Sequence, residues 1–324
     1  MENALVEVKE LKKYFRTRRG LLHAVDGVSF QIEAGKTLGV VGESGCGKST
    51  LGRMLVHLEE STAGAMLFDG EDVTVLKKRE LHKFRHNSQI IFQDPYSSLD
   101  PRNTVEDIIM EPLILSKQYS RIEARQKAEE LMDAVEIAKR LRTAYPHELD
   151  GGRRQRVGIA RALAYDPKFI VCDEPVSALD VSVQAQVLNL LQQLKRDKNL
   201  TYMFITHDLA VVRYISDNIA VMYLGQQVET CEAKELFRKP YHPYTQALLS
   251  AITTTDIHNR KKRITIKGEI TSPINPKPGC RFASRGPYSC ERCMEPVALE
   301  EVEPGHFVSC CRVREINHLD NPAG

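Results

Sequence analysis

A glycine-rich segment at residues 42–49 constrains the fold of this chain more than any other feature. Its sequence is Gly-Glu-Ser-Gly-Cys-Gly-Lys-Ser, with an apolar run at 38–41 before it and a helix-like run at 50–58 after it. Glycines let backbone N–H groups curl round an anion at a helix N-terminus. This order of strand, loop and helix therefore predicts a phosphate-binding loop in which Lys48 reaches phosphate oxygens and the Ser49 hydroxyl ligates Mg²⁺.

A second run, at residues 169–174, reads Phe-Ile-Val-Cys-Asp-Glu and predicts a buried strand that ends in two carboxylates. Asp173 can hold Mg²⁺ through its water shell, and Glu174 can orient and deprotonate an attacking water. An apolar strand that ends in acids is weak evidence alone, because strand ends often carry acids. Together with the phosphate loop, it is strong evidence for a phosphoryl-transfer site.

The remainder of the chain predicts an α/β fold with additions. Of its 324 residues, 42% are hydrophobic and 27% charged, which is typical of a soluble globular protein. Short apolar runs alternate with helical segments, as buried strands of a parallel sheet would. The predicted strands cover residues 6–8, 28–32, 38–41, 89–92, 169–172, 202–205 and 219–223.

We expect a nucleotide-binding domain at residues 1–253 with an inserted helical subdomain at about 104–164, followed by a Cys-rich extension at 254–324. A Pro-rich linker at 271–279 opens the extension. The N-terminus has no secretory apolar region, so we expect a cytosolic chain with reduced cysteines. A net charge of +2 gives no global field for nucleic acid, and we expect no nucleic-acid partner.

Further short segments, in a fixed order, resemble the nucleotide-binding subunit of an ABC transporter. They are Gln93, Leu-Asp-Gly-Gly-Arg-Arg-Gln-Arg at 149–156, Ser-Ala-Leu-Asp at 177–180 and Ile-Thr-His-Asp at 205–208. Residues 92–102, 242–245 and the Cys-rich tail with 304–307 resemble the oligopeptide/dipeptide (and nickel) importer branch. The resemblance implies a P-loop NTPase core with an antiparallel β-subdomain.

The resemblance also implies roles at the ATP site. Lys48, Gln93, Glu174 and His207 would be catalytic, and Ser49, Gln93 and Asp173 would hold Mg²⁺. Tyr14 would stack on adenine, although neighbouring Phe15 could serve instead. The predicted ATP-binding residues are Tyr14, Gly42, Glu43, Ser44, Gly45, Cys46, Gly47, Lys48, Ser49 and Thr50.

In this family each ATP is enclosed by the signature of the opposite subunit. This chain's signature, which would enclose the partner's ATP, consists of Asp150, Gly151, Gly152 and Arg153, and its D-loop contains Asp180. The usual signature has Ser where this chain has Asp150 and commonly Gln where it has Arg153. An ionised carboxylate cannot donate a hydrogen bond and repels the γ-phosphate. We hypothesise slower hydrolysis at the site that this signature closes. The alternative is a fully active variant in which Arg153 compensates the charge of Asp150.

As partners, the resemblance implies two membrane permease subunits, a second and non-identical ATP-binding subunit, and an extracytoplasmic solute-binding protein. The chain would then be a peripheral motor on the cytoplasmic face of the membrane that drives peptide uptake. Import of nickel or another small solute is an alternative. A soluble ABC ATPase that acts on nucleic acid or ribosomes is a more distant one.

The tail departs from the family pattern, which has cysteines at the positions of Cys280, Gly286, Cys293 and Cys310. Gly286 breaks the pattern, and Cys290 supplies a Cys-x-x-Cys pair with Cys293. Four thiolates can hold an iron–sulfur cluster or Zn²⁺. Our hypothesis is a [4Fe–4S] cluster or Zn²⁺ on Cys280, Cys290, Cys293 and Cys310, against the alternative of reduced structural thiols.

Overall fold

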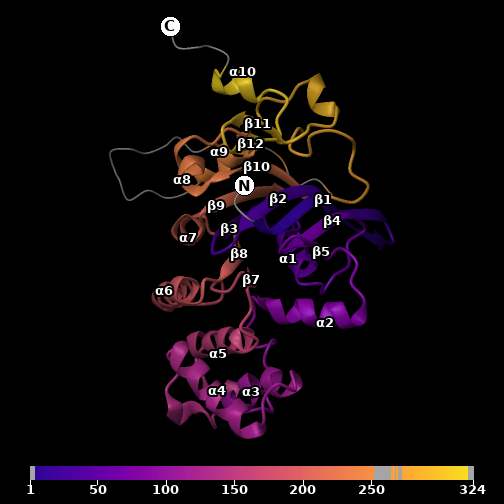
Figure 1. Cartoon of the computed structure of the whole chain (residues 1–324). Coiled ribbons are helices and arrows are strands. Elements are labelled where there is room, and N and C mark those ends of the chain that lie inside the picture. Colours follow the sequence, from indigo (N-terminus) through magenta and orange to yellow (C-terminus); the bar gives the residue numbers. More distant parts are fainter. Residues whose placement is uncertain (1–3, 252–263, 267, 269–271, 320–324) are drawn as a thin grey trace.

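The computed structural model describes residues 4–251, 264–266, 268 and 272–319. Two sheets form its framework (Figure 1), one four-stranded in the order β2-β1-β4-β5 and one eight-stranded in the order β11-β12-β10-β9-β3-β8-β7-β6. The strands are β1 Ala4–Thr17, β2 Gly20–Glu33, β3 Thr37–Val41, β4 Ala63–Phe68, β5 Glu71–Asp72, β6 Ser88–Ile91, β7 Phe169–Asp173, β8 Thr201–Ile205, β9 Asn218–Tyr223, β10 Gln226–Glu232, β11 Glu300–Glu303 and β12 His306–Val308. The helices are α1 Lys48–Leu55, α2 Lys78–Asn87, α3 Val105–Leu115, α4 Arg121–Ala134, α5 Gly151–Leu163, α6 Val181–Lys198, α7 Leu209–Ile215, α8 Ala233–Arg238, α9 Pro243–Ser250 and α10 Val313–Asn317, with 3₁₀ turns η1 Lys139–Leu141, η2 Pro146–Glu148 and η3 Glu291–Met294.

The centre of the large sheet is parallel, from β6 through β7, β8 and β3 to β9. Every residue of β3, β7 and β8 is buried, which explains why these strands are continuous apolar runs. All seven predicted strands lie in observed ones, apart from residue 92, which follows the end of β6. The predicted α/β core and its antiparallel β-subdomain, the four-stranded sheet, are confirmed.

Helices α3, α4 and α5 lie together at one end of the molecule (Figure 1) and contribute to one apolar core. Helix α3 begins at a capping box in which the Thr104 hydroxyl accepts a hydrogen bond from the Asp107 N–H. Ser120 and Glu123 begin α4 in the same way. These helices occupy the stretch where the sequence predicts a helical insert.

The extension packs at the opposite end (Figure 1), and its strands β12 and β11 continue the large sheet beyond β10. A fully buried carboxylate, Glu229 in β10, accepts hydrogen bonds from the N–H groups of Tyr241 and His242 and contacts Nε2 of His306 in β12 at 2.7 Å. The residues described after 271 therefore share a core and a sheet with the ATPase portion. The predicted boundary at 253/254 lies outside the described residues.

The apolar stretches of the described helices are too short for any of those helices to span a membrane.

Candidate active site

The phosphate loop runs from β3 to α1, and close packing explains its glycines. A Cβ on Gly42 would lie 2.1 Å from the Met222 carbonyl oxygen, and one on Gly47 would lie 2.0 Å from that of Ala24. Gly47 also has a φ of 103°, which favours glycine. These positions hold the loop against β9 and β2, so its N–H groups are preorganised at the start of α1.

Lys48 and Ser49 face the predicted phosphate and magnesium positions. Lys48 is buried, and its Nζ donates to the carbonyl oxygens of Gly42 at 2.8 Å and Glu43 at 3.1 Å. The Ser49 hydroxyl donates to Oδ1 of Asp173 at 2.7 Å. Burial raises the pKa of Asp173, while this hydrogen bond acts in the opposite direction. The structure thus brings together two predicted magnesium ligands, both hard oxygens of the kind that Mg²⁺ prefers.

Glu174 is the centre of the predicted catalytic group. Its Oε2 accepts a hydrogen bond from Nε2 of Gln93 at 3.1 Å and contacts Nδ1 of His207 at 3.1 Å. These residues follow β7, β6 and β8, whose carboxyl ends meet at one edge of the sheet. Glu174 adopts a left-handed φ of 47°, a conformation that is strained for a residue with a side chain and common at functional sites.

Tyr14, the predicted adenine residue, lies in β1 beside β2. Its ring stacks on that of His23 with centroids 4.0 Å apart, and its hydroxyl donates to Oδ1 of Asp26. Burial, together with this hydrogen bond, raises the pKa of Tyr14 to about 12, which keeps the phenol neutral. Neighbouring Phe15 carries the Lys13 ammonium 4.8 Å from its ring centroid.

The signature begins helix α5. Asp150 is the N-cap, and its Oδ1 accepts a hydrogen bond from the Arg153 N–H at 2.8 Å. Its Oδ2 lies 3.1 Å from Nη1 of Arg153, with both side chains more than half exposed. In the D-loop, Asp180 caps α6 by accepting from the Val183 N–H. Asp150 thus caps α5, and Arg153 pairs with its carboxylate.

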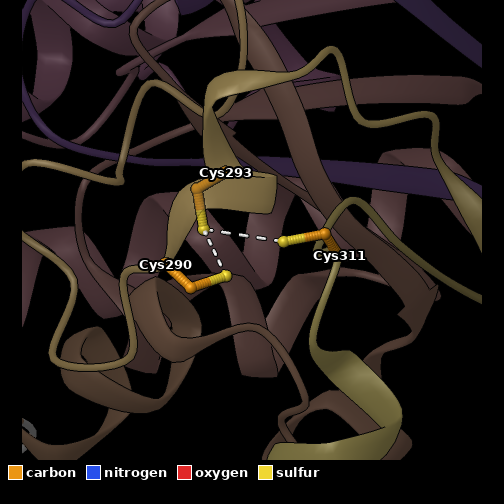
Figure 2. Close-up of side chains that lie close together, drawn as sticks. All are labelled: Cys290, Cys293 and Cys311. Atoms are coloured by element: carbon orange, nitrogen blue, oxygen red, sulfur yellow. Dashed lines mark hydrogen bonds between the residues drawn. The ribbon is translucent and has the colours of Figure 1, made fainter.

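Three cysteines of the tail converge (Figure 2). The Sγ atoms of Cys290 and Cys293 are 3.8 Å apart, and those of Cys293 and Cys311 are 3.5 Å apart. Among the described residues, these cysteines form the one group of three or more metal-ligating side chains (His, Cys, Asp or Glu) whose ligand atoms all lie within 4.8 Å of one another. The predicted ligands Cys280 and Cys310 line a small cavity beside Cys293. Sequence reasoning left out Cys311, since nothing in the adjacent pair 310–311 shows which thiol faces the cluster.

Two further contacts on the phosphate loop carry no sequence signal. The Tyr244 hydroxyl accepts a hydrogen bond from the Glu43 N–H at 2.9 Å. Arg285 of the extension pairs with the Glu43 carboxylate at 2.8 Å. Glu43 and Tyr244 belong to separate sequence motifs and Arg285 to neither, and nothing in those motifs indicates these contacts, so only the fold brings the three residues together.

Comparisons with known proteins agree with this geometry. Residues 25–177 match the family model for the ABC transporter, and residues 228–293 match that for the oligopeptide/dipeptide transporter C-terminal region. The oligopeptide transport ATP-binding protein AppF of Bacillus subtilis is 48% identical over 320 residues, which cover 95% of this chain and 97% of that protein. The chain belongs to the ABC transporter ATP-binding proteins, in the oligopeptide transport branch. OppF of the same organism, also an oligopeptide transport ATP-binding protein, is 49% identical over 312 residues, covering 96% of this chain and 97% of OppF.

Solved ABC cassettes share the fold of the ATPase portion. A dimeric cassette in a post-hydrolysis state bound to ADP and Pi matches with a TM-score of 0.64 at 30% identity, over 70% of this chain and 98% of that one. CbiO1 from Clostridium perfringens, part of the ABC transporter complex CbiONQ, matches with a TM-score of 0.66 at 27% identity, over 74% of this chain and 92% of that one. The chain is therefore an ABC-type ATPase.

Proposed function

We propose that this ABC ATPase is the motor subunit of an importer for oligopeptides or dipeptides. The observation that carries the proposal is the grouping of Gln93, Glu174 and His207 beside the Ser49–Asp173 pair, in a chain whose tail matches the peptide-transporter extension. The named relatives are oligopeptide transport proteins, which favours peptides over nickel or another small solute.

In this proposal, separate groups of residues bind the phosphates, hold Mg²⁺ and transfer the proton during hydrolysis. The loop N–H groups and the Lys48 ammonium bind the phosphates, for which Lys48 exchanges its carbonyl partners. Ser49 and Asp173 would hold Mg²⁺, which neutralises charge on the phosphates when bound. Glu174 accepts the proton of the attacking water, while Gln93 and His207 hold its carboxylate in place and reach the γ-phosphate side. Tyr14 supplies the adenine contact.

The chain acts with other subunits. It lies peripherally on the cytoplasmic face of the membrane, docked on two permease subunits, and an extracytoplasmic binding protein delivers the solute. ATP joins its loop to the signature of a second, non-identical ATPase, and the signature at Asp150–Arg153 closes that partner's ATP. This second site is the slower one in the proposal, because an ionised Asp150 cannot donate a hydrogen bond to the γ-phosphate, even though Arg153 pairs with its charge.

The tail holds an iron–sulfur cluster or Zn²⁺ in this proposal. Cys290, Cys293 and Cys311 supply three ligands, and Cys280 or Cys310 supplies the fourth. The donor set supports it, because thiolates suit both zinc and iron–sulfur clusters.

Replacing Glu174 with glutamine tests the catalytic assignment. In the assembled complex, ATP affinity should remain, while ATP hydrolysis falls by about 10²–10⁴-fold through loss of the general base. Glu235→Gln, the same chemical change at a carboxylate paired with Arg238 on α8, is the control. Hydrolysis by the Glu174 variant within a factor of about two of the control would reject Glu174 as the base.

Metal analysis tests the tail. The chain purified without oxygen should contain iron with acid-labile sulfide, or zinc, and Cys311→Ser should lose it. Comparing Cys280→Ser with Cys310→Ser then identifies the fourth ligand. If the anaerobic protein contains neither iron, acid-labile sulfide nor zinc, the alternative of reduced thiols remains.

A further inference from the structure

A short segment of the extension, residues 280–286, lies between the cysteine cluster and the ATP site. Its first residue, Cys280, donates its N–H to the Cys293 carbonyl oxygen at 2.8 Å. Its arginines, Arg281 and Arg285, point the other way, into the ATPase portion, and both side chains are almost fully buried. Below, residues 280–286 are called the arginine segment.

Arg285 contacts the phosphate loop. Its Nη1 donates to Oε2 of Glu43 at 2.8 Å and to the Tyr223 hydroxyl at 3.2 Å. Glu43 is the second residue of the loop, so its charge adds to the electrostatic potential at the proposed position of the ATP phosphates. An unpaired carboxylate there would repel them, and the guanidinium cancels that charge.

Arg281 contacts the adenine side. Its Nη2 donates to Oδ2 of Asp26, and the other oxygen of that carboxylate accepts the hydroxyl of Tyr14. His23 also meets Oδ2, through Nδ1 at 3.1 Å, and stacks on the Tyr14 ring. Asp26 therefore fixes the orientation of the Tyr14 ring, and Arg281 neutralises and holds Asp26.

An aromatic anchor keeps the arginine segment in place. Phe282, only 3% exposed, lies with its ring centroid 5.3 Å from that of Tyr223 and 5.4 Å from that of Tyr244. Tyr244 in turn accepts the N–H of Glu43. The segment is thus packed against the same loop residue from two directions, through Arg285 and through the aromatic rings.

We infer that Arg285 and Arg281 are positioning residues of the ATP site, supplied by the extension: Arg285 acts on the phosphate loop through Glu43, and Arg281 acts on adenine through Asp26 and Tyr14. The inference rests on the proposed assignment of residues 42–49 and Tyr14 to ATP. It makes the extension a part of the nucleotide site of its own chain.

The test measures binding of Mg-ATP and of Mg-tripolyphosphate, which lacks adenine, by competition against a labelled nucleotide on the full-length chain. Arg285→Gln should raise the Kd of both ligands about tenfold. Arg281→Gln should raise the Kd of ATP several-fold and leave that of tripolyphosphate within about twofold. Lys239→Gln is the matched control, since Lys239 also joins the ATPase portion to the extension, through Glu303 at 3.0 Å, but contacts no residue of the loop.

A double-mutant cycle separates positioning from direct contact. If Arg285 acts through Glu43, Arg285→Gln should cost less than about threefold in a Glu43→Gln background. A full tenfold loss there, or equal losses for the Lys239 control, would overturn the inference. So would an Arg281 variant that weakens tripolyphosphate as much as ATP. Lys48→Ala tests the site itself: if that variant binds ATP normally, the assignment of the loop fails, whatever the arginines do.

Discussion

Replacing Gly152 with alanine tests how closely the signature helix α5 must approach α6. A Cβ at Gly152 would lie 2.4 Å from Cγ1 of Val183, in the first turn of α6. Valine is stiff at χ1, so it cannot swing away easily, and the helices must separate. Overpacking of this kind costs about 1–3 kcal/mol, while alanine gains about 0.4–1 kcal/mol by restricting the unfolded chain. We expect a net loss of about 1–2 kcal/mol in the free energy of unfolding.

Gly158 provides the matched control in the same helix. A Cβ there meets nothing within 4 Å, so Gly158→Ala should stabilise the chain by about 0.5–1 kcal/mol through helix propensity alone. Urea unfolding of the full-length chain measures both variants. ATP hydrolysis by the assembled complex should fall for Gly152→Ala only, because displacing α5 moves the N–H groups that the proposal places against the partner's ATP.

A second substitution checks the mechanism. Val183→Ala removes the clashing methyl group, so Gly152→Ala should cost less in that background than alone. The reasoning is refuted if Gly152→Ala is as stable as Gly158→Ala and the complex keeps its hydrolysis rate. It is also refuted if the loss is the same in the presence and absence of Val183.

Three further predictions concern charge. Asp150→Ser with Arg153→Gln should raise ATP hydrolysis by the complex up to about twofold, since one of two sites regains its serine, and an unchanged rate would reject the impaired-site hypothesis. Burial lowers the pKa of His242 from 6.5 to about 4, so as the pH falls the unfolded chain takes up this proton before the folded one does. The free energy of unfolding should therefore drop by up to about 3 kcal/mol as the pH falls from 6.5 to 4. In urea titrations, His242→Gln should flatten this loss. Burial raises the pKa of Asp173, so Mg²⁺-dependent ATP binding should strengthen as the pH rises through that raised value. Asp173→Asn should abolish this pH dependence in a binding titration.

The fold was predictable where burial imposes a simple pattern. Strands such as β7 and β8 are buried on both faces and are therefore continuous apolar runs. Two of the predicted catalytic residues, Glu174 and His207, follow the carboxyl ends of those strands, so contiguous motifs could indicate them. The pairing of β10 with β12 was not predictable, because β12 has three residues and its buried His306 is stabilised by Glu229, far away in sequence.

The cysteine tail shows why spacing alone could not choose the thiols. Cys290 caps the 3₁₀ turn η3 and Cys293 lies within it, so their convergence follows from their Cys-x-x-Cys spacing. Cys310 packs against the small apolar cluster of Tyr241, Val308 and Val313 and lines a cavity with Cys293, while the thiol of the next residue, Cys311, contacts Cys293 directly. At Gly286, where the family pattern has cysteine, a Cβ would lie 3.1 Å from the Phe282 ring, and that ring is the anchor of the arginine segment. In this structure the thiols of Cys290 and Cys311 lie beside Cys293, while the glycine at 286 leaves room for the Phe282 ring against Tyr223 and Tyr244.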